Sequence, residues 1–418
     1  MWVLLALYLV LSSIVMPGAH AKEAGAFAQV DAHAEKAPPS AEKSVSALAK
    51  YLVRQARNDE EKARAIFRWI TLNVSYDTAR YQSGAPGAMS PEEVLHRRKA
   101  VCSGYAALFE HLAKEAGLEA VTIRGHSKGY PISASERQDS DLNHAWNAVK
   151  IDGKWRLLDC TWGAGHVTPS MKFVRKFSEH YFLTPPEEFL YGHFPLEPKW
   201  QLLDRPVARH EYERMVPLRP DFFRCGLALH SHRWASFEAE DSATVTLTGP
   251  EDALLLCNLM RDGKELGRSY TLTQREKGKI VTRVRFPRPG NYILRYFVKR
   301  RNESGPYSWA LDYQITASRG AKERAEFPKT YGTFQESGAI LEEPMVWRLK
   351  AGERQRFSLR VPGAAAVAVS VDGKWTHLQR TGDRFTGEVA LRPGPVQLCA
   401  SLDPAKRSYS VLLEYEAK

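Results

Sequence analysis

The sequence has few cysteines, and none of them has the spacing of a metal site or a disulfide framework. Only five occur in 418 residues, at Cys102, Cys160, Cys225, Cys257 and Cys399. No C-x-x-C pair and no zinc-type cysteine and histidine spacing is present, and no acidic cluster has the spacing of a calcium loop. The sequence therefore predicts neither a metal nor another cofactor.

Long apolar runs are absent after residue 21, so no later segment is predicted to span a bilayer. The first 21 residues, "MWVLLALYLVLSSIVMPGAHA", contain no Asp, Glu, Lys or Arg and end in an A-x-A cleavage pattern. We predict a signal peptide over residues 1–21 and hence a secreted or extracytoplasmic protein. Because no basic residue precedes the apolar run, an uncleaved signal anchor stays open, and only that form would contact a membrane. Residues 22–43, rich in Ala, Lys, Glu and Pro, predict a flexible leader.

Export would allow cysteines that lie close together to oxidise. Cys225 and Cys257 fall in one predicted β domain and are the favoured pair, although the sequence does not fix their disulfide state.

The net charge of +11 is dispersed along the chain. Its densest cluster, "VKRRN" at residues 298–302, is short and lies in a β-rich region, where it indicates a solvated edge or loop. No nucleic-acid-binding motif is present, so no nucleic-acid partner is predicted. With 44% hydrophobic and 26% charged residues, the chain has the composition of a globular protein of about two to four domains.

Helical periodicity dominates the first part of the chain. In "NDEEKARAIFRWITLNVSYD" the apolar residues follow the 3.6-residue period, and Asn58 with Glu61 forms a plausible capping pair. A second periodic segment starts at Cys102 and stops near Gly117. The residues predicted to line the apolar faces of the two helices are Ala63, Ile66, Phe67, Ile70 and Val74, then Tyr105, Leu108, Phe109 and Leu112.

A β-hairpin is predicted in "NHAWNAVKIDGKWRLLDCTWGAG". Asp152 and Gly153 form the turn, so residues whose numbers sum to 305 oppose each other. Asp159 is then a diagonal neighbour of His144, within reach of its side chain. Four residues share one face of this hairpin: His144, Trp146, Asp159 and Thr161.

Beyond about residue 218 the sequence predicts short β-strands bounded by Gly, Pro or Asp. A weak repeat, "RPGNYILRYFV" at Arg288 and "RPGPVQLCASL" at Arg392, has the length of an immunoglobulin-like sandwich. We predict two such domains in tandem, over residues 218–318 and 325–418.

Cys102, His144 and Asp159 have the properties of a nucleophilic site. A helix N-terminus stabilises a thiolate, a histidine accepts the thiol proton, and a carboxylate orients the imidazole. Taken singly, each residue also has a structural interpretation as a core cysteine, a satisfied histidine or a helix cap. The order Cys, His, Asp favours catalysis if the helix and the hairpin pack against each other.

The segments "IFRWITLNVSYD", "KAVCSGYAALFEHLAKEAGLEA" and "NHAWNAVKIDGKWRLLDCTWGAG" resemble the transglutaminase-like superfamily, which has a papain-related fold. "HYFLTPPEEFLYGHFPLEPKWQLL" and "DFFRCGLALHSH" resemble its kyphoscoliosis-peptidase branch, in which β-sandwich domains follow the core. The resemblance implies an α+β fold with a catalytic domain over residues 44–205, followed by the two all-β immunoglobulin-like domains.

The same resemblance implies residue roles. Cys102 matches the nucleophile, His144 the general base and Asp159 the orienting acid. Cys160 stands where a small residue is expected, and we interpret it as core packing. The implied chemistry is acyl transfer through a thioester, with the Cys102 N–H and more weakly Tyr76 as oxyanion donors. Trp146 and Trp162 are expected to form walls of the site, and core packing stays open as the alternative for both.

Three functions remain open from the sequence. The first is a peptidase or amidase, the second a glutamine transamidase that cross-links proteins, and the third a non-catalytic binding or adhesion protein. A protein or peptide substrate is expected for the first two. The β domains would contact a protein or a cell surface, and the loop over residues 125–142 is expected to cover the cleft.

Overall fold

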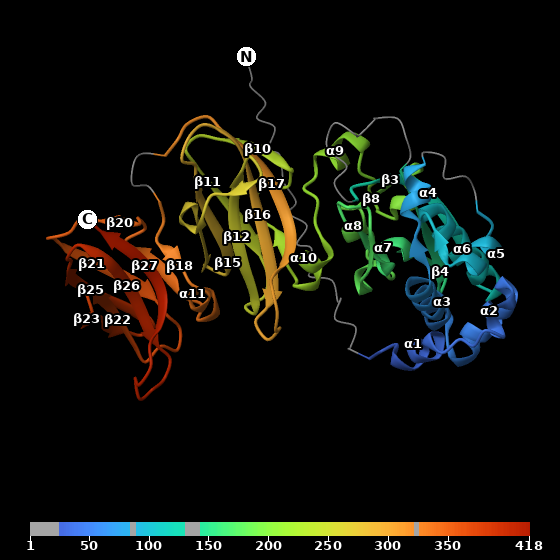
Figure 1. Cartoon of the computed structure of the whole chain (residues 1–418), viewed down its shortest axis with the longest axis horizontal. Coiled ribbons are helices and arrows are strands. Elements are labelled where there is room, and N and C mark those ends of the chain that lie inside the picture. The colour runs from blue at the N-terminus through green and yellow to red at the C-terminus, as the bar shows by residue number, and fades with distance from the viewer. Residues whose placement is uncertain (1–24, 84–88, 130–142, 322–325) are drawn as a thin grey trace, which may run out of the picture.

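The computed structural model describes residues 25–83, 89–129, 143–321 and 326–418. An α+β N-terminal domain is followed by a first and then a second β-sandwich, side by side in chain order (Figure 1). This confirms the predicted fold class. The predicted signal peptide, residues 1–21, lies outside the described residues. None of the described helices is both long and apolar enough to cross a bilayer.

The prediction of a flexible leader over residues 22–43 is wrong for its described part. Helix α1 (Ala28–Glu35) buries Val30 and Ala34, and the short helix η1 (Ala41–Lys43) follows it. Arg64 of α3 (Asp59–Asn73) is buried and donates two hydrogen bonds to Asp31, at 2.7 and 2.8 Å. The overall composition of residues 22–43 is polar, so it did not indicate the apolar face of α1. It also did not indicate that Asp31 pairs with the buried Arg64.

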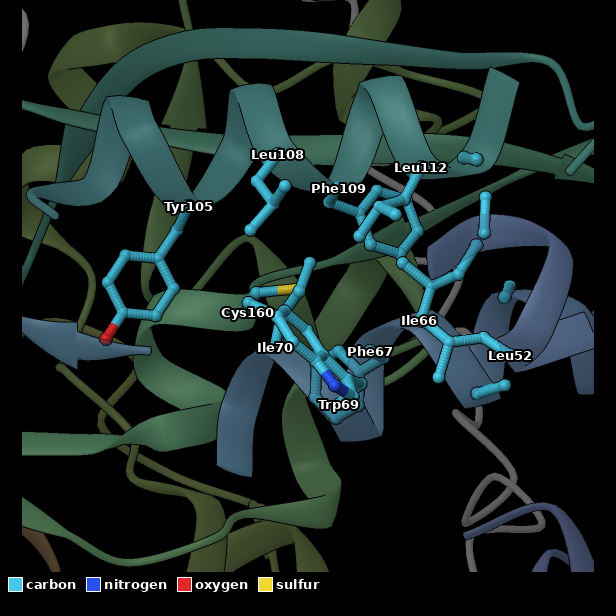
Figure 2. Close-up of a cluster of buried hydrophobic side chains, with 14 of the residues drawn as sticks. Leu52, Ile66, Phe67, Trp69, Ile70, Tyr105, Leu108, Phe109, Leu112 and Cys160 are labelled. Carbon is cyan, nitrogen blue, oxygen red and sulfur yellow. The ribbon is translucent and has the colours of Figure 1, made fainter. Parts of the chain in front are cut away.

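Helices α3 and α6 (Cys102–Glu115) are both present where the periodicity predicted them, and they contribute to the core of the N-terminal domain. The side chain of Asn58 caps α3 by accepting from the Glu61 N–H at 2.9 Å. The predicted apolar faces of both helices are buried against each other. Figure 2 shows Cys160 within this cluster, beside Ile70 and below α6, which confirms its interpretation as core packing.

One antiparallel sheet of order β5-β4-β3-β8 carries the predicted hairpin. Its strands are β3 (Ala120–Ser127), β4 (His144–Ile151), β5 (Lys154–Leu158) and β8 (His193–Pro195). Ile151 pairs with Lys154 across the predicted turn, where Asp152 and Gly153 both have positive φ, 49° and 75°, as a type I′ turn requires.

The ladder ends earlier than predicted. Its last pair is Asn147 with Leu158, so Asp159 and Thr161 do not pair across the hairpin. Asp159 instead caps the short helix α7 (Cys160–Ala164). The predicted loop over 125–142 is also shorter, because residues 125–127 belong to β3. Residues 130–142 lie outside the described part of the chain.

Short elements complete the N-terminal domain and the connection to the first sandwich. They are α2 (Val45–Leu52), η2 (Val53–Gln55), β1 (Ser75–Tyr76), α4 (Thr78–Gln82), α5 (Pro91–Arg97), β2 (Lys99–Ala100), β6 (Gly165–Val167), β7 (Phe173–Arg175), η4 (Glu179–Tyr181), α8 (Pro186–Phe189), η5 (Pro198–Gln201), α9 (Arg209–Arg214) and α10 (Pro220–Arg224).

The first sandwich packs a sheet of order β10-β17-β16-β12-β13 against one of order β14-β15-β11-β9. Its elements are β9 (Ala228–Leu229), β10 (Ser236–Ala239), β11 (Ser242–Thr248), β12 (Ala253–Arg261), β13 (Lys264–Glu265), η6 (Arg268–Tyr270), β14 (Thr271–Glu276), β15 (Lys279–Arg285), β16 (Gly290–Arg300) and β17 (Ser308–Ala317). Cys225 and Cys257 are both buried in this domain, but all five cysteines of the chain are free. The favoured disulfide is therefore not formed.

The second sandwich has a sheet of order β18-β27-β26-β22-β23, with β20 also on β27, and one of order β19-β21-β25-β24. Its elements are β18 (Lys329–Thr330), α11 (Gly332–Glu336), β19 (Ile340–Glu343), β20 (Arg348–Leu349), β21 (Arg354–Arg360), β22 (Ala366–Val371), β23 (Lys374–His377), β24 (Gln379–Thr381), β25 (Arg384–Ala390), β26 (Gly394–Ser401) and β27 (Ser410–Ala417).

The "RPG" repeat has a structural counterpart in the two sandwiches. Its glycines, Gly290 and Gly394, begin β16 and β26, and both have positive φ, 137° and 123°. Gly290 pairs with Ala317 at the end of β17, and Gly394 pairs with Ala417 at the end of β27. Strands β16 and β26 are both interior strands of their sheets. The repeat therefore marks the start of an equivalent strand in each of the two sandwiches.

Candidate active site

Cys102 is the first residue of the 14-residue helix α6. The first N–H groups of a helix have no intrahelical acceptor, and the helix dipole favours negative charge there. The chain enters the helix tightly from β2, and Gly104 permits this approach because a Cβ at that position would lie 2.7 Å from the Cβ of Ala100. The sulfur of Cys102 is thus held, partly exposed, at a position that stabilises a thiolate.

His144 is the first residue of β4, and its side chain is almost fully buried. Its Nε2 lies 2.8 Å from Oδ2 of Asp159. His144 also lowers the pKa of the Cys102 thiol, so its ring lies close to the sulfur, and Nδ1 is the ring nitrogen that Asp159 does not contact. The imidazole therefore bridges the sulfur and the carboxylate.

Asp159 is completely buried at the N-terminus of α7. Its Oδ1 accepts from the backbone N–H groups of Thr161 at 2.7 Å and Trp162 at 3.1 Å. Gly163 lets α7 pack closely on α3, because a Cβ there would lie 2.5 Å from the ring of Phe67. With Oδ1 fixed by the backbone, Oδ2 faces His144.

The environment favours a thiolate and an imidazolium over their neutral forms. Burial disfavours the Cys102 thiolate, but the hydrogen bond and charge of His144 outweigh it and hold the pKa of the thiol below its ordinary value. Burial likewise disfavours the imidazolium, but the charge and hydrogen bond of Asp159 raise the pKa of His144 to about 10. Burial would raise the pKa of Asp159, yet His144 and His193 together hold it well below its usual range.

His193 is the residue of this site that the sequence analysis missed. It lies in β8, and its Nε2 is 3.0 Å from the same Oδ2 of Asp159 that faces His144. The two partners are 34 residues apart, and only the pairing of β8 with β3 brings them together. A single histidine in "LYGHFPLEP" is more typical of a structural residue, so the sequence carried no specific signal for it.

The two tryptophans occupy different positions. Trp162 stacks on His144 with ring centroids 5.1 Å apart and remains partly exposed, as expected for a wall of the site. Trp146 is only 1% exposed and packs against His193 and Phe189 behind the triad. Trp146 therefore has the core-packing role that the sequence left open, because α8 and β8 cover it.

Tyr76 lies near the start of α6. Strand β1 pairs with β2 through Tyr76 and Ala100, two residues before Cys102. Burial raises the pKa of the Tyr76 hydroxyl, and the negative charge of Cys102 raises it further. Its hydroxyl is therefore protonated and able to donate a hydrogen bond near the sulfur.

Two comparisons with known proteins agree with this arrangement. The family model of the transglutaminase-like superfamily matches residues 46–160, and that of the KY-like, immunoglobulin-like domain matches residues 209–329. The N-terminal part of this chain is therefore a transglutaminase-like domain. Its matched segment contains Cys102, His144 and Asp159, whereas His193 lies outside it.

Several curated proteins are similar in sequence to this chain. Kyphoscoliosis peptidase of Mus musculus is 33% identical over 290 residues, which are 69% of this chain and 43% of that protein. Hillarin of Drosophila melanogaster is 34% identical over 241 residues, 54% of this chain and 29% of that protein. Lim and transglutaminase domain protein ltd-1 of Caenorhabditis elegans is 34% identical over 205 residues, 46% of this chain and 28% of that protein. The chain thus spans less than half the length of these relatives.

His144, Asp159 and His193 offer three ligand atoms within 4.8 Å of one another, a grouping that also occurs at metal sites. In the transglutaminase-like domain, however, both Nε2 atoms lie at hydrogen-bond distance from one Oδ2, at 2.8 and 3.0 Å. A metal ion would have to replace both N–H protons and bind each ligand at about 2.0–2.2 Å. We interpret the group as a hydrogen-bonded cluster.

Proposed function

We propose that this protein is a transglutaminase-like cysteine enzyme that acts on the amide bonds of a protein or peptide, as a peptidase or amidase. One observation carries the proposal: His144 hydrogen-bonds Asp159 through Nε2 and also lowers the pKa of the Cys102 thiol, which stands at a helix N-terminus. A solely structural cysteine does not need a buried imidazole and carboxylate beside it.

The first half of the reaction forms a thioester. The Cys102 thiolate attacks the amide carbonyl carbon, a C–S bond forms, and the carbonyl π electrons move to oxygen. The N–H of Cys102 and the hydroxyl of Tyr76 donate to this oxyanion. When the electrons return, the C–N bond breaks, and the imidazolium of His144 gives its proton to the leaving nitrogen.

The second half regenerates the enzyme. Neutral His144 takes a proton from water, the resulting hydroxide attacks the thioester, and the C–S bond breaks to release a carboxylic acid and the thiolate. Asp159 stays ionised throughout and holds the imidazole in orientation. An amine in place of water would give a new amide, which is the transamidase alternative.

We also propose that the protein acts outside the cytoplasm, since residues 1–21 have the pattern of a secretory signal. The tandem sandwiches support a contact with a protein or cell-surface partner, because they extend the chain away from the N-terminal domain (Figure 1).

A glutamine-containing peptide probe that traps the thioester nucleophile tests the enzyme. We expect covalent mass on Cys102, located by peptide mass spectrometry and lost in His144→Ala. His166→Ala is the matched control, because His166 is exposed on β6. Adding a primary amine then separates hydrolysis from transamidation by product mass. An unmodified Cys102 in folded, reduced protein would contradict the proposal and favour a binding protein.

A further inference from the structure

A second histidine, outside the proposed triad, contacts the carboxylate of Asp159. His193 is 2% exposed, and its Nε2 donates to Oδ2 of Asp159 at 3.0 Å. Oδ2 therefore accepts two hydrogen bonds from imidazoles, while Oδ1 accepts two from the backbone. Asp159 has four donors in all, and the one from His193 does not come from the triad or from the carboxylate's own helix.

Aromatic rings hold His193 in this orientation. Its ring is stacked on Phe189 with centroids 3.9 Å apart and an interplanar angle of 17°. Trp162 contacts it at 4.3 Å, and the edge of Trp146 at 5.0 Å. These ring contacts restrain the imidazole in the orientation that aims its donor at the carboxylate.

The surroundings also fix the charge of His193. Asp159 of the α7 cap and His144 of β4 are the charged groups that face it, and Tyr181 of η4 is a neutral neighbour. Burial lowers the pKa of His193 to about 4, despite the hydrogen bond and charge of Asp159. His193 is therefore neutral near pH 7. The backbone of Phe189 also interacts with the ring, but an ionised carboxylate is the stronger acceptor, so we expect the single proton on Nε2, facing Asp159.

We propose that His193 is a positioning residue whose neutral Nε2–H keeps the proton shared by Asp159 and His144 on His144. The proposal rests on the proposed function, because it matters only if His144 serves Cys102. A hydrogen bond to a carboxylate favours its ionised form and reduces its basicity. At a buried carboxylate, loss of this donor would make Asp159 compete more strongly for the Nε2 proton of His144.

Loss of the His193 N–H donor would change the pKa of the Cys102 thiol. If the shared proton moves toward Asp159, the imidazolium loses positive charge and the Cys102 thiolate loses its counter-ion. The pKa of the thiol then rises toward its ordinary value, and thiolate-dependent reactions start at higher pH. A role in packing alone would leave this pH dependence unchanged.

Two substitutions in the full chain separate hydrogen bonding from packing. His193→Phe keeps a flat ring between Phe189 and Trp162 but has no donor. His193→Gln loses the ring but has an amide nitrogen near the position of Nε2. The measurement is the rate of Cys102 alkylation by iodoacetamide between pH 4 and 9, with the modified residue identified by mass spectrometry and folding checked by circular dichroism.

We expect His193→Phe to react roughly tenfold more slowly at pH 6, by analogy with the loss of outer-shell partners at metal sites, and its profile to move to higher pH. His193→Gln should stay within about threefold of the unmodified protein. The reverse order, or no change in either variant, would overturn the proposal. If the unmodified protein itself shows an ordinary thiol profile, the proposed function fails, and this inference fails with it.

A measurement on the unmodified chain keeps the test valid if the Phe variant does not fold. Nuclear magnetic resonance of ¹⁵N-histidine-labelled protein reports the tautomer of each imidazole, and His193→Gln identifies the signal of His193. We expect a neutral ring protonated at Nε2 from pH 5.5 to 8. A cationic ring, or the Nδ1-protonated tautomer, at pH 7 would contradict the proposal.

Discussion

Gly125 is the ladder partner of His144, and the absence of a side chain at Gly125 lets β8 lie against β3 at this point. A Cβ on Gly125 would lie 2.2 Å from the carbonyl oxygen of Phe194 and 2.5 Å from the ring of Trp146. The strand that carries His193 therefore depends on a glycine opposite the base of the triad.

We predict that Gly125→Ala destabilises the protein by about 2–4 kcal/mol, because backbone rather than a flexible side chain must move. It should also slow alkylation of Cys102, since both histidines are displaced. Urea unfolding and the alkylation rate measure the two effects. Gly332→Ala is the control, because a Cβ there meets only the Glu336 side chain at 3.7 Å; equal losses in both variants would contradict the argument.

Asp159→Asn should move the pH profile of Cys102 alkylation to higher pH. Without the carboxylate charge, the raised pKa of His144 falls, and the imidazolium that stabilises the thiolate is lost above neutral pH. Each unit of increase in the thiol pKa lowers the thiolate fraction about tenfold below that pKa. Asp152→Asn controls for the amide substitution, because Asn-Gly also forms the type I′ turn. A profile unchanged from that control would refute the charge argument.

Tyr76→Phe should reduce turnover by roughly 10²-fold through loss of an oxyanion donor, while alkylation of Cys102 keeps its rate. The two effects separate because an alkylating agent has no carbonyl oxyanion to stabilise. Steady-state kinetics on a cleaved peptide substrate measures the first and iodoacetamide the second. Tyr81→Phe, at an exposed neighbouring ring, should change neither. Parallel losses in both assays for Tyr76→Phe would indicate a packing role.

Stability should fall between pH 6.5 and pH 4 through His193. Its pKa is lowered to about 4 in the folded state from about 6.5 in the unfolded chain. Over this window the unfolded state binds a proton that the folded state does not, so unfolding becomes easier as the pH falls. The linkage amounts to at most about 3 kcal/mol. Urea unfolding of His193→Phe should show a smaller loss over the same window; an equal loss would assign the effect to other groups.

His144 contributes to the pH dependence of stability in the opposite direction. Because its pKa is raised to about 10, its stabilisation is complete below the unfolded value of about 6.5 and is lost as the pH rises toward 10. Unfolding at pH 7 and 9.5, compared between the unmodified protein and His144→Ala, should show the greater alkaline loss in the unmodified protein.

Arg64→Met should loosen the N-terminal segment. Arg64 is buried and donates to both Asp31 and Glu179, so its removal leaves the carboxylate of Asp31 without its partner. We expect a loss of about 3 kcal/mol and faster proteolysis within residues 25–44. Lys62→Ala, which breaks an exposed i,i+3 pair with Asp59, should cost less than about 0.5 kcal/mol. Unchanged proteolysis in Arg64→Met would show that α1 is held by its apolar contacts alone.

Local sequence determined the elements that depend on neighbouring residues. The Asn58 cap, the face of α6 and the turn at Asp152-Gly153 all follow from interactions within a few residues, and the structure has each of them. The prediction of the hairpin was less accurate at the end far from its turn. Asp159 caps α7 instead of extending the strand, because its carboxylate can satisfy two free N–H groups of a helix start.

The sequence by itself indicated the candidate residues Cys102, His144 and Asp159. It also indicated the division of the chain into an α+β domain and two sandwiches, because periodicity and turn chemistry depend on residues that are close together in the sequence. Only the tertiary structure decided that β8 carries His193 to Asp159, that Trp146 is covered, and that α1 is held by Arg64. Each of these contacts joins residues that are far apart along the chain, and their burial depends on which surfaces meet after the chain has folded.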